Sequence, residues 1–375
     1  MIFRSKAFVV VAAIAVAVFL ATVPTFRHFF DLGVYRGAVH YWLIDGGDLY
    51  DYRYQGTEYG FTYPPFAGLA MSPLAITSWP VAVAASVVLN CVAVILLIRW
   101  YFVPILQSRG WPVWTPCALM FLGFLVFEPS RDTFSYGQVN LLLLVLVGSD
   151  LRNKRFAGVG IGLAAAIKLT PVIFIGYLIL ARRYRAAATA AITCAAVTIL
   201  ALLVAPDASR AFWTDAVWDT SRIGRLYYVS NQSLRGVLAR LDAPSMWWLA
   251  GVALIVAYWC WWVRTRQPGP AAGFAVTGVV ACLISPITWV HHLVWLIPGL
   301  FLLLDRTLRT RDRRLLATLG AGFVLMSSSI VWIWWAHPHG WPAFPGSNTY
   351  VWLSIAVFLT LTREKTRIGE YAEKS

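Results

Sequence analysis

Long apolar runs separated by short polar segments extend along almost the whole chain. Most of these runs approach the ~20 consecutive apolar residues that an α-helix needs to cross a bilayer. The pattern predicts an all-α polytopic membrane protein with about 12 transmembrane helices. The predicted spans cover residues 7–23, 80–98, 112–127, 139–149, 156–167, 171–181, 186–205, 245–263, 271–284, 290–304, 315–335 and 350–362.

A shorter apolar piece at residues 64–76 lies between prolines and is too short for a full crossing. We interpret it as an interfacial or re-entrant helix within the first outer loop, residues 24–79. A second large outer loop is predicted over residues 206–244. Because spans follow one another along the chain, residues 1–375 are expected to form a single integral membrane domain.

Composition excludes an ordinary soluble protein. The 375 residues are 59% hydrophobic and only 13% charged, whereas roughly 25% of residues are charged in typical globular domains. The first apolar run, which follows Arg4 and Lys6, resembles either a signal peptide or a membrane anchor. We favour the anchor, because no convincing small-x-small cleavage site follows it.

The net charge of +14 is distributed unevenly along the chain. With both termini in the cytoplasm, most Lys and Arg residues fall on inner segments and most Asp and Glu residues on outer ones, as the positive-inside rule requires. The surplus therefore indicates topology and gives no reason to expect a nucleic-acid partner. The outer loops are the longer and more varied ones, so we expect the active site on the outer face of the plasma membrane.

The sequence gives no indication of a metal or a cofactor. The five cysteines lie inside apolar runs without CxxC spacing, which favours small core residues over disulfide or zinc chemistry. No pair of carboxylates has an evident metal-ligand spacing. We therefore expect neither a metal nor a bound cofactor.

The first outer loop contains Asp31, just beyond the first predicted span. A partly desolvated carboxylate at the membrane surface keeps a raised pKa and suits a general base. The alternative is that Asp31 caps a short amphipathic surface helix. One residue can do both, and the sequence leaves the two roles open.

The second outer loop contains Arg131, Gln138 and Asn140 and runs into an apolar helix. A guanidinium group at the membrane face suits a phosphate, because it offers two parallel donors. The alternative is an ion-pair cluster of Arg131 with Glu128 and Asp132. Gln138 and Asn140 are candidates to hydrogen-bond sugar hydroxyls, or else cap the helix.

Lys168 stands alone between two apolar runs, on the outer side where the positive-inside rule disfavours a lysine. An ionisable group at the mouth of a helix bundle is a functional candidate, usually for an anion. The alternative is that its side chain extends toward the lipid headgroups.

Two further polar clusters lie on predicted outer segments. Asn231 and Gln232 fall in the large outer loop, where amides beside tyrosines are typical of sugar-binding surfaces but also of surface loops in general.

His291 and His292 enter an apolar helix, where neighbouring side chains point about 100° apart and are poorly placed to share a metal. A hydrogen bond to phosphate or proton transfer suits one of them. Packing against Trp289 and Trp295 is the alternative.

These candidates converge at one membrane face, and they suit a transfer reaction whose donor is anchored in lipid through a phosphate. Asp31 is expected to deprotonate an acceptor hydroxyl. Arg131, Lys168 and one histidine are expected to stabilise the departing phosphate.

The combination of motifs resembles the actinobacterial polyprenyl-phosphate-mannose-dependent α-1,2-mannosyltransferases, a family of GT-C membrane glycosyltransferases. The similarity extends from Asp31 to about Trp295, and beyond Trp295 it is mainly one of hydropathy. It rests on Asp31-Leu32-Gly33-Val34-Tyr35, Phe61-Thr62-Tyr63-Pro64-Pro65-Phe66, Glu128-Pro129-x-Arg131-x-Thr133-Phe134-x-Tyr136-Gly137-Gln138-x-Asn140, Lys168-Leu169-Thr170-Pro171, Asn231-Gln232-Ser233-x-Arg235-Gly236 and Ser285-Pro286-Ile287-x-Trp289-x-His291-His292.

The resemblance implies a GT-C fold and an inverting transfer from β-linked polyprenyl-phosphate-mannose to a lipid-linked mannoside, either a phosphatidylinositol mannoside or lipomannan. It implies that Asp31 is the base, that His291 or His292 lies near the donor phosphate, and that Tyr63 belongs to the substrate-binding set. One rival is the same fold with another polyprenyl-phosphate sugar, such as arabinofuranose. A rival of another class is a lipid-linked-sugar flippase or transporter, which is expected to show two related halves. We see no such internal repeat.

Overall fold

The structure, a computed structural model, describes residues 6–23, 27–153 and 155–363. Within these residues the regular structure is helical, and β pairing is limited to one isolated bridge between Asn231 and Trp289. The fold class predicted from the hydrophobic pattern, an all-helical protein, is therefore confirmed.

Each predicted apolar run coincides with a helix. The α-helices in these runs are α1 (Lys6–Thr22), α4 (Trp79–Leu97), α6 (Trp114–Val126), α8 (Asn140–Ser149), α9 (Val159–Ile167), α10 (Ile173–Leu180), α11 (Tyr184–Val204), α14 (Ser245–Arg266), α15 (Pro270–Ile284), α16 (Ile297–Thr310), α17 (Arg313–Ser327) and α19 (Thr349–Thr362).

Two runs are interrupted. The run at 290–304 begins as a 3-10 helix, η8 (Val290–Leu296), before α16. The run at 315–335 breaks at Ser329, whose φ of 57° is left-handed, and continues as a second 3-10 helix, η9 (Ile330–Trp334). In contrast, α4 continues through a π-helical turn into α5 (Val103–Gln107), beyond the end of its predicted run.

The helices differ in whether they are long enough to cross a bilayer. By length and composition, three segments of the described chain are long and apolar enough to cross a membrane, namely 79–107, Tyr184–Val204 and Ser245–Arg266. Helix α8 has ten residues, which extend about 15 Å at 1.5 Å per residue, against a hydrocarbon core of about 30 Å. The count of about 12 full crossings stays a prediction.

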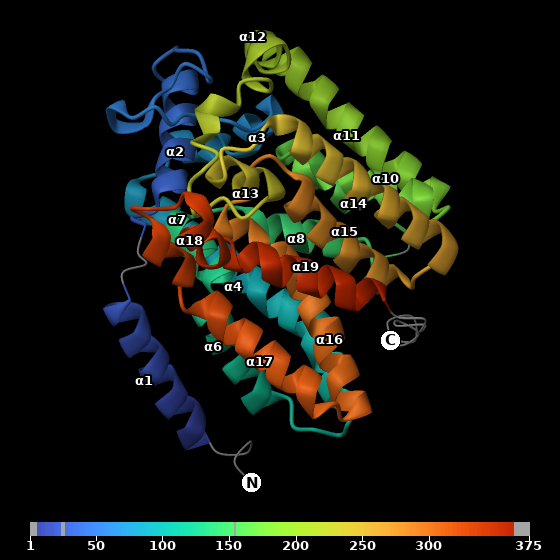
Figure 1. The fold of residues 1–375 in the computed structure, drawn as a ribbon. Coiled ribbons are helices and arrows are strands. Elements are labelled where there is room, and N and C mark those ends of the chain that lie inside the picture. Colours follow the sequence, from blue (N-terminus) through green and yellow to red (C-terminus); the bar gives the residue numbers. More distant parts are fainter. Residues whose placement is uncertain (1–5, 24–26, 154, 364–375) are drawn as a thin grey trace.

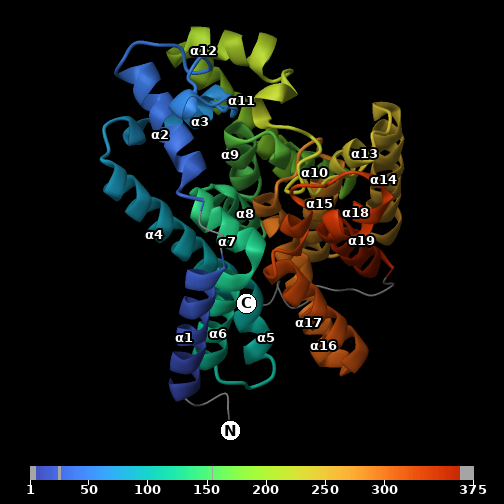
Figure 2. The same ribbon diagram turned by 60° about the vertical axis from the view of Figure 1, so that its left-hand side comes forward.

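The predicted outer loops meet at one end of the molecule. Figure 1 shows α2 (Phe30–Leu43), α3 (Pro65–Ala70) and α12 (Pro206–Ala211) at the top, and the start of α1 and the turn between α16 and α17 at the bottom. Figure 2 shows α1 lying along α6. Residues 27–79 and 206–244, far apart in sequence, lie together, and the Arg222 guanidinium donates to the Tyr50 carbonyl between them.

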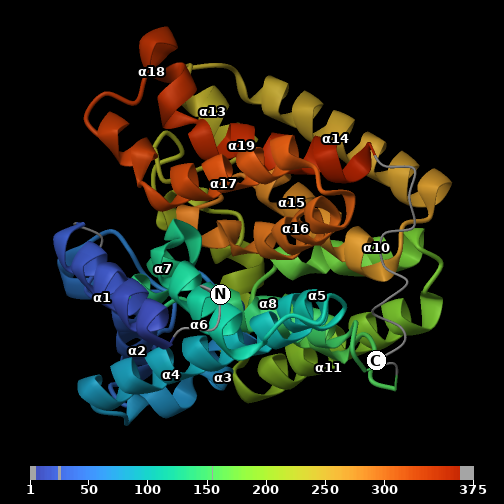
Figure 3. The same cartoon turned by 90° about the horizontal axis from the view of Figure 1, so that it is seen from below.

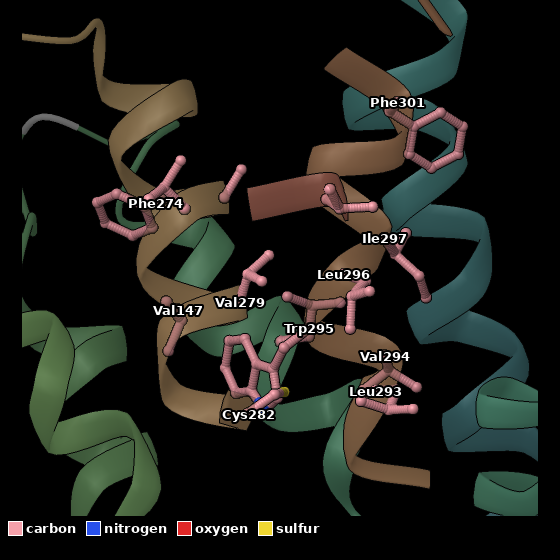
Figure 4. Close-up of a cluster of buried hydrophobic side chains, with 14 of the residues drawn as sticks. Val147, Phe274, Val279, Cys282, Leu293, Val294, Trp295, Leu296, Ile297 and Phe301 are labelled. Carbon is pink, nitrogen blue, oxygen red and sulfur yellow. The ribbon is translucent and has the colours of Figure 1, made fainter. Parts of the chain in front are cut away.

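Helix α15 lies at the centre of the packing. Every residue from Ala272 to Leu283 is buried, as expected of a helix that is apolar on all sides. In Figure 4, Val279 and Cys282 of this helix lie beside Trp295 of η8. A side chain at Gly278 would approach the carbonyl oxygen of Trp295 to 3.0 Å, so glycine is required there for close packing.

Two long helices lie at the periphery. Figure 3 shows α11 and α14 on opposite edges of the bundle, with α15 between them. In each of these helices, only 17% of an 18-residue apolar stretch is buried. Exposed apolar side chains on helices of this length are typical of lipid-facing surfaces.

Candidate functional site

A cavity of about 1420 Å³ lies where the predicted outer segments meet. Its walls come from α2, the loop before α3, α7 (Glu128–Tyr136), the segment after α9, and the segments on either side of η8 and η9. Among the residues predicted from sequence, six line it, namely Asp31, Tyr63, Gln138, Lys168, His291 and His292.

Asp31 lies in the first turn of α2. The helix begins after Phe29, and no side chain caps it. The Asp31 carboxylate instead accepts a hydrogen bond at Oδ2 from Nε2 of Gln138, at 2.8 Å. The structure therefore shows Asp31 as a cavity carboxylate and not as a helix cap.

Gln138 connects Asp31 to two tyrosines. Helix α7 ends at Gly137, whose φ of 71° turns the chain so that Gln138 enters the cavity wall. Its Oε1 accepts hydrogen bonds from the Tyr63 hydroxyl at 3.0 Å and from Nδ2 of Asn140 at 3.3 Å. The hydroxyls of Tyr63 and Tyr35 are 2.9 Å apart. This buried network fixes the orientation of the Gln138 amide, and through it the carboxylate.

Lys168 lies at the end of α9, where the extended backbone points its side chain into the protein. Its Nζ is 3.0 Å from Oδ1 of Asn140, 3.2 Å from the Tyr63 hydroxyl and 3.0 Å from Nε2 of His292. It also lies 4.9 Å from the centre of the Tyr63 ring. The lysine is therefore a cavity residue and does not extend toward lipid headgroups.

Burial shifts the pKa values of both charged groups toward the neutral range. Desolvation raises the pKa of Asp31 to about 6, against the opposing effects of the Gln138 hydrogen bond and the Lys168 charge. Desolvation lowers the pKa of Lys168 to about 7, against the opposing effect of Asp31. A carboxylate and an amine that titrate this close to neutrality suit acid–base chemistry.

The two adjacent histidines have different neighbours. His292 contacts Lys168 through Nε2, and its Nδ1 accepts the backbone N–H of Trp289 at 3.2 Å. A neutral imidazole that accepts at Nδ1 carries its hydrogen on Nε2, so this arrangement pairs His292 with an uncharged Lys168 amine. His291 turns away, with its ring edge-on to Tyr136 at 5.3 Å between centroids. Of the pair, His292 is the one at the Lys168 cluster.

Four of the predicted site residues do not line the cavity, namely Arg131, Asn140, Asn231 and Gln232. The Arg131 guanidinium donates to the carbonyl oxygens of Val126 at 3.0 Å and Ser327 at 3.2 Å, and to Oγ of Ser329 at 2.6 Å. In the described part of the chain it forms no ion pair with Glu128 or Asp132. Arg131 thus joins α7 to the break after α17, and the structure does not bring it to the cavity.

The two amides of the large outer loop are also engaged elsewhere. Asn231 donates to the carbonyls of Leu226 and Pro286 at 2.9 and 3.2 Å and accepts the N–H of Thr288 at 2.9 Å. Gln232 donates to the Ser347 carbonyl at 2.8 Å and accepts the N–H groups that begin α19. Both side chains are fully buried, so they hold loops together. Asn140 lies one layer behind the cavity wall, bonded to Gln138 and Lys168.

Replacing Arg131 by alanine is expected to destabilise the protein without changing donor affinity. Loss of the guanidinium leaves buried carbonyls without donors, which costs about 2–4 kcal/mol. We expect a lower melting temperature in detergent and an unchanged KM for the donor. A donor KM that rises while the melting temperature stays constant would contradict this structural role.

Several cavity residues carry no clear signal in the sequence. Arg27, Asp132 and the aromatic side chains of Tyr228, Trp332 and Trp335 all line the cavity. Helical spacing offers one clue, because Asp132 and Tyr136 are four residues apart and share a face of α7. The aromatic residues come from separate segments, and only the fold brings them together.

The cluster can deprotonate a hydroxyl and hold an anion. Asp31 supplies the acceptor for a proton, and Lys168 with His292 supplies N–H donors on the other side of Gln138 and Tyr63. Within the described residues, no three His, Cys, Asp or Glu side chains gather as metal ligands would. A reaction without metal stays a prediction.

Comparison with known proteins gives the family. Residues 61–286 match the model of glycosyltransferase family 87. This range contains the cavity residues Tyr63, Asp132, Tyr136, Gln138, Lys168 and Tyr228. No solved structure matches the chain.

Curated relatives match over most of the chain. One from Mycobacterium tuberculosis is 29% identical, over 90% of this chain and 86% of its own length. It is named a polyprenol-phosphate-mannose-dependent alpha-(1-2)-phosphatidylinositol mannoside mannosyltransferase, and a relative from Mycolicibacterium smegmatis with the same name is 28% identical over 92% and 86% of the two chains. A second M. smegmatis protein, named for a phosphatidylinositol pentamannoside acceptor, is 32% identical over 79% and 74%. The chain therefore belongs to glycosyltransferase family 87.

Proposed function

We propose that this protein transfers mannose from polyprenyl-phosphate-mannose to a hydroxyl of a lipid-linked mannoside, forming an α-1,2 linkage on the outer face of the plasma membrane. The observation that carries the proposal is the pairing of Asp31 with Lys168 across one cavity, joined through Gln138 and Tyr63. Such a transfer needs a base and an anion-binding group, and this network supports Asp31 and Lys168 in those roles.

The bond changes follow from this arrangement. The acceptor hydroxyl attacks the anomeric carbon of the donor sugar as its proton passes to Asp31. The bond between that carbon and the phosphate oxygen breaks, and the electron pair leaves with the polyprenyl phosphate. Lys168, protonated once the phosphate is bound, and His292 stabilise the developing charge on that phosphate. Attack from the face opposite the leaving group inverts the anomeric configuration.

The volume and lining of the cavity are evidence for two lipid-linked substrates. Its volume of about 1420 Å³ exceeds the ~300–1,000 Å³ of ordinary small-molecule pockets. One wall is apolar and is formed by Ile173 of α10, Val252 of α14, and Ala281 and Ile284 of α15. Apolar side chains next to a phosphate-binding lysine suit a prenyl chain that continues into the bilayer. The printed names of the mycobacterial relatives specify the same donor and acceptor classes.

The proposed topology has about 12 crossings, with both termini in the cytoplasm. Its support is the distribution of basic residues and the meeting of segments 24–79 and 206–244 at one end of the molecule. The short helices α2 and α3 are then interfacial, and the Asp31 cavity faces outward. A cysteine introduced at Asp51 is expected to react with impermeant thiol reagents in intact cells.

Two alternatives remain distinguishable by experiment. A transferase of the same fold that uses polyprenyl-phosphate-arabinofuranose would need the same base and lysine, and differs only in the sugar transferred. A flippase or transporter would move lipid-linked sugar across the bilayer without forming a glycosidic bond. The coupling of a base to an anion-binding group favours transfer, because transport requires no proton acceptor at the sugar.

The test is incubation of the purified protein with radiolabelled polyprenyl-phosphate-mannose and a panel of lipid-linked mannosides. We expect label to appear in a product one α-1,2-linked mannose longer than one of the acceptors. Labelled polyprenyl-phosphate-arabinofuranose is offered in a parallel reaction. If only that donor gives labelled product, the transferred sugar is arabinofuranose and not mannose. Movement of label across proteoliposome membranes without product would replace the enzyme assignment.

The pH profile of kcat/KM is expected to be bell-shaped and narrow. Activity falls as pH drops below about 6, because Asp31 becomes protonated and no longer accepts a proton. It also falls as pH rises above about 7, because Lys168 loses the charge that binds phosphate. Bound phosphate raises the lysine pKa, so the alkaline limb of kcat lies at higher pH than that of kcat/KM. An alkaline limb that persists in Lys168→Met would contradict the assignment.

A further inference from the structure

A second polar cluster lies on the cavity wall, next to the Asp31 network. It consists of Asp132 and Tyr136 on α7, His291 on η8, and Arg27 before α2. The Tyr136 ring meets the His291 ring at 5.3 Å between centroids. The Arg27 guanidinium lies 5.8 Å from the centre of the same tyrosine ring. The ring of Tyr136 therefore contacts both His291 and Arg27.

Three polar atoms of this cluster lack partners. Asp132 is 1% exposed and His291 5% exposed. Among the described residues, no hydrogen-bond partner exists for Oδ1 of Asp132, Nε2 of His291 or Nε of Arg27, all buried. Each unsatisfied buried group costs about 1–3 kcal/mol. Several such groups on one cavity wall indicate a ligand that completes their hydrogen bonds.

The unpaired atoms define the chemistry of that ligand. Desolvation and the charge of Glu128 raise the pKa of Asp132 to about 8, so at neutral pH its carboxyl group can both donate and accept a hydrogen bond. Nε of Arg27 needs an acceptor. A sugar hydroxyl both donates and accepts, so it can complete the hydrogen bonds of both groups. The cluster is therefore suited to a neutral polyol.

An aromatic wall continues from this cluster. The Arg27 guanidinium lies 4.4 Å from the centre of a Trp332 ring. The rings of Trp332 and Trp335 are 5.6 Å apart, and those of Trp335 and Tyr228 are 5.4 Å apart. Broad aromatic faces next to a few convergent polar groups are typical of ligand sites, and they can pack against the C–H face of a pyranose ring.

We propose that Asp132, with His291 and Arg27, binds the hydroxyls of the acceptor's terminal sugar against the wall of Trp332 and Trp335, and so selects the acceptor. The inference rests on the proposed function and divides its cavity into two parts. Asp31, Lys168 and His292 act at the reacting atoms and the donor phosphate. Asp132 is a specificity-determining residue, which positions the acceptor.

The test compares kinetic constants for acceptor and donor separately. Asp132→Leu keeps the side-chain size and removes both oxygens, and we expect it to raise the acceptor KM by about 10- to 100-fold. The donor KM and kcat at saturating acceptor are expected to stay near wild type. Against a series of monodeoxy mannoside acceptors, the wild type should discriminate against one analogue, and Asp132→Leu should not.

Two further variants keep the outcome decisive. His291→Phe retains the ring contact with Tyr136 but removes both nitrogens, and it should raise the acceptor KM in the same way. Asp207→Asn is the matched control, because Asp207 is exposed on α12 and does not line this cavity. Its kinetic constants should match the wild type.

Direct binding separates this inference from the proposed function. An alkyl mannoside is titrated into each purified variant, and tryptophan fluorescence is followed. Tighter binding by wild type than by Asp132→Leu and His291→Phe, without any sugar transfer, overturns the proposed function alone. Transfer by wild type with an unchanged acceptor KM and unchanged binding in both variants overturns the acceptor site alone.

Discussion

Replacing Asp31 by asparagine is expected to lower kcat by about 1,000-fold, within the range of general-base contributions. Asparagine keeps the size of the side chain and an oxygen that can accept the Gln138 hydrogen bond, but it cannot take a proton from the acceptor. The donor should still bind, because Lys168 and His292 are unchanged. Initial rates and donor affinity of the purified variant measure both effects.

Asp51→Asn serves as the control for this variant. Asp51 lies in the same outer loop, is exposed, and does not line the cavity. It should retain wild-type rates. Near-normal turnover by Asp31→Asn, with a melting temperature equal to that of the control, would remove Asp31 from the role of base.

Replacing Lys168 by methionine is expected to raise the donor KM by about 100-fold, which corresponds to about 2.7 kcal/mol. Methionine fills a similar volume but cannot donate to the phosphate, and it leaves Oδ1 of Asn140 without its 3.0 Å donor. The acceptor KM should change little. Donor titrations at saturating acceptor give the measurement.

Two further variants test whether the loss of donor affinity comes from the charge at this position. They are Lys168→Arg, which keeps the charge, and Arg210→Met, which removes a charge elsewhere. Arginine retains the charge and should recover part of the donor affinity, although its planar group fits the position of an amine poorly. Arg210 is an exposed cation on α12 and does not line the cavity, and its replacement should leave the donor KM unchanged. Equal donor constants in Lys168→Met and wild type would return Lys168 to a purely structural role.

The two predicted phosphate ligands show what residue patterns can and cannot decide. Arg131 and Lys168 were selected by one argument, since both are cations on the side that the positive-inside rule leaves poor in them. That argument identifies the membrane face but not the direction of a side chain. Arg131 donates to the Ser327 carbonyl oxygen and to the Ser329 hydroxyl at the break after α17, whereas Lys168 enters the cavity. The break itself has no clear signal in a serine-rich, apolar sequence.

The choice between the two histidines depends on tertiary contacts in the same way. Adjacent residues differ in direction by about 100° on a helix, so the sequence predicts that only one of them faces a given ligand. Which one does so depends on the rotation of η8 against α7 and α9. In the fold His292 faces Lys168, and His291 faces Tyr136.

The sequence by itself determined the helical fold class, the apolar helices and the set of polar segments in which the site lies, because hydrophobic period and charge distribution act locally along the chain. It also identified Asp31, Gln138, Lys168 and the histidine pair. Only the tertiary structure decided which of these meet. Gln138 bonds Asp31 from 107 positions away and Lys168 reaches His292 across 124 positions. Such contacts depend on how helices rotate and pack against one another, which is set by the whole core and by no single segment.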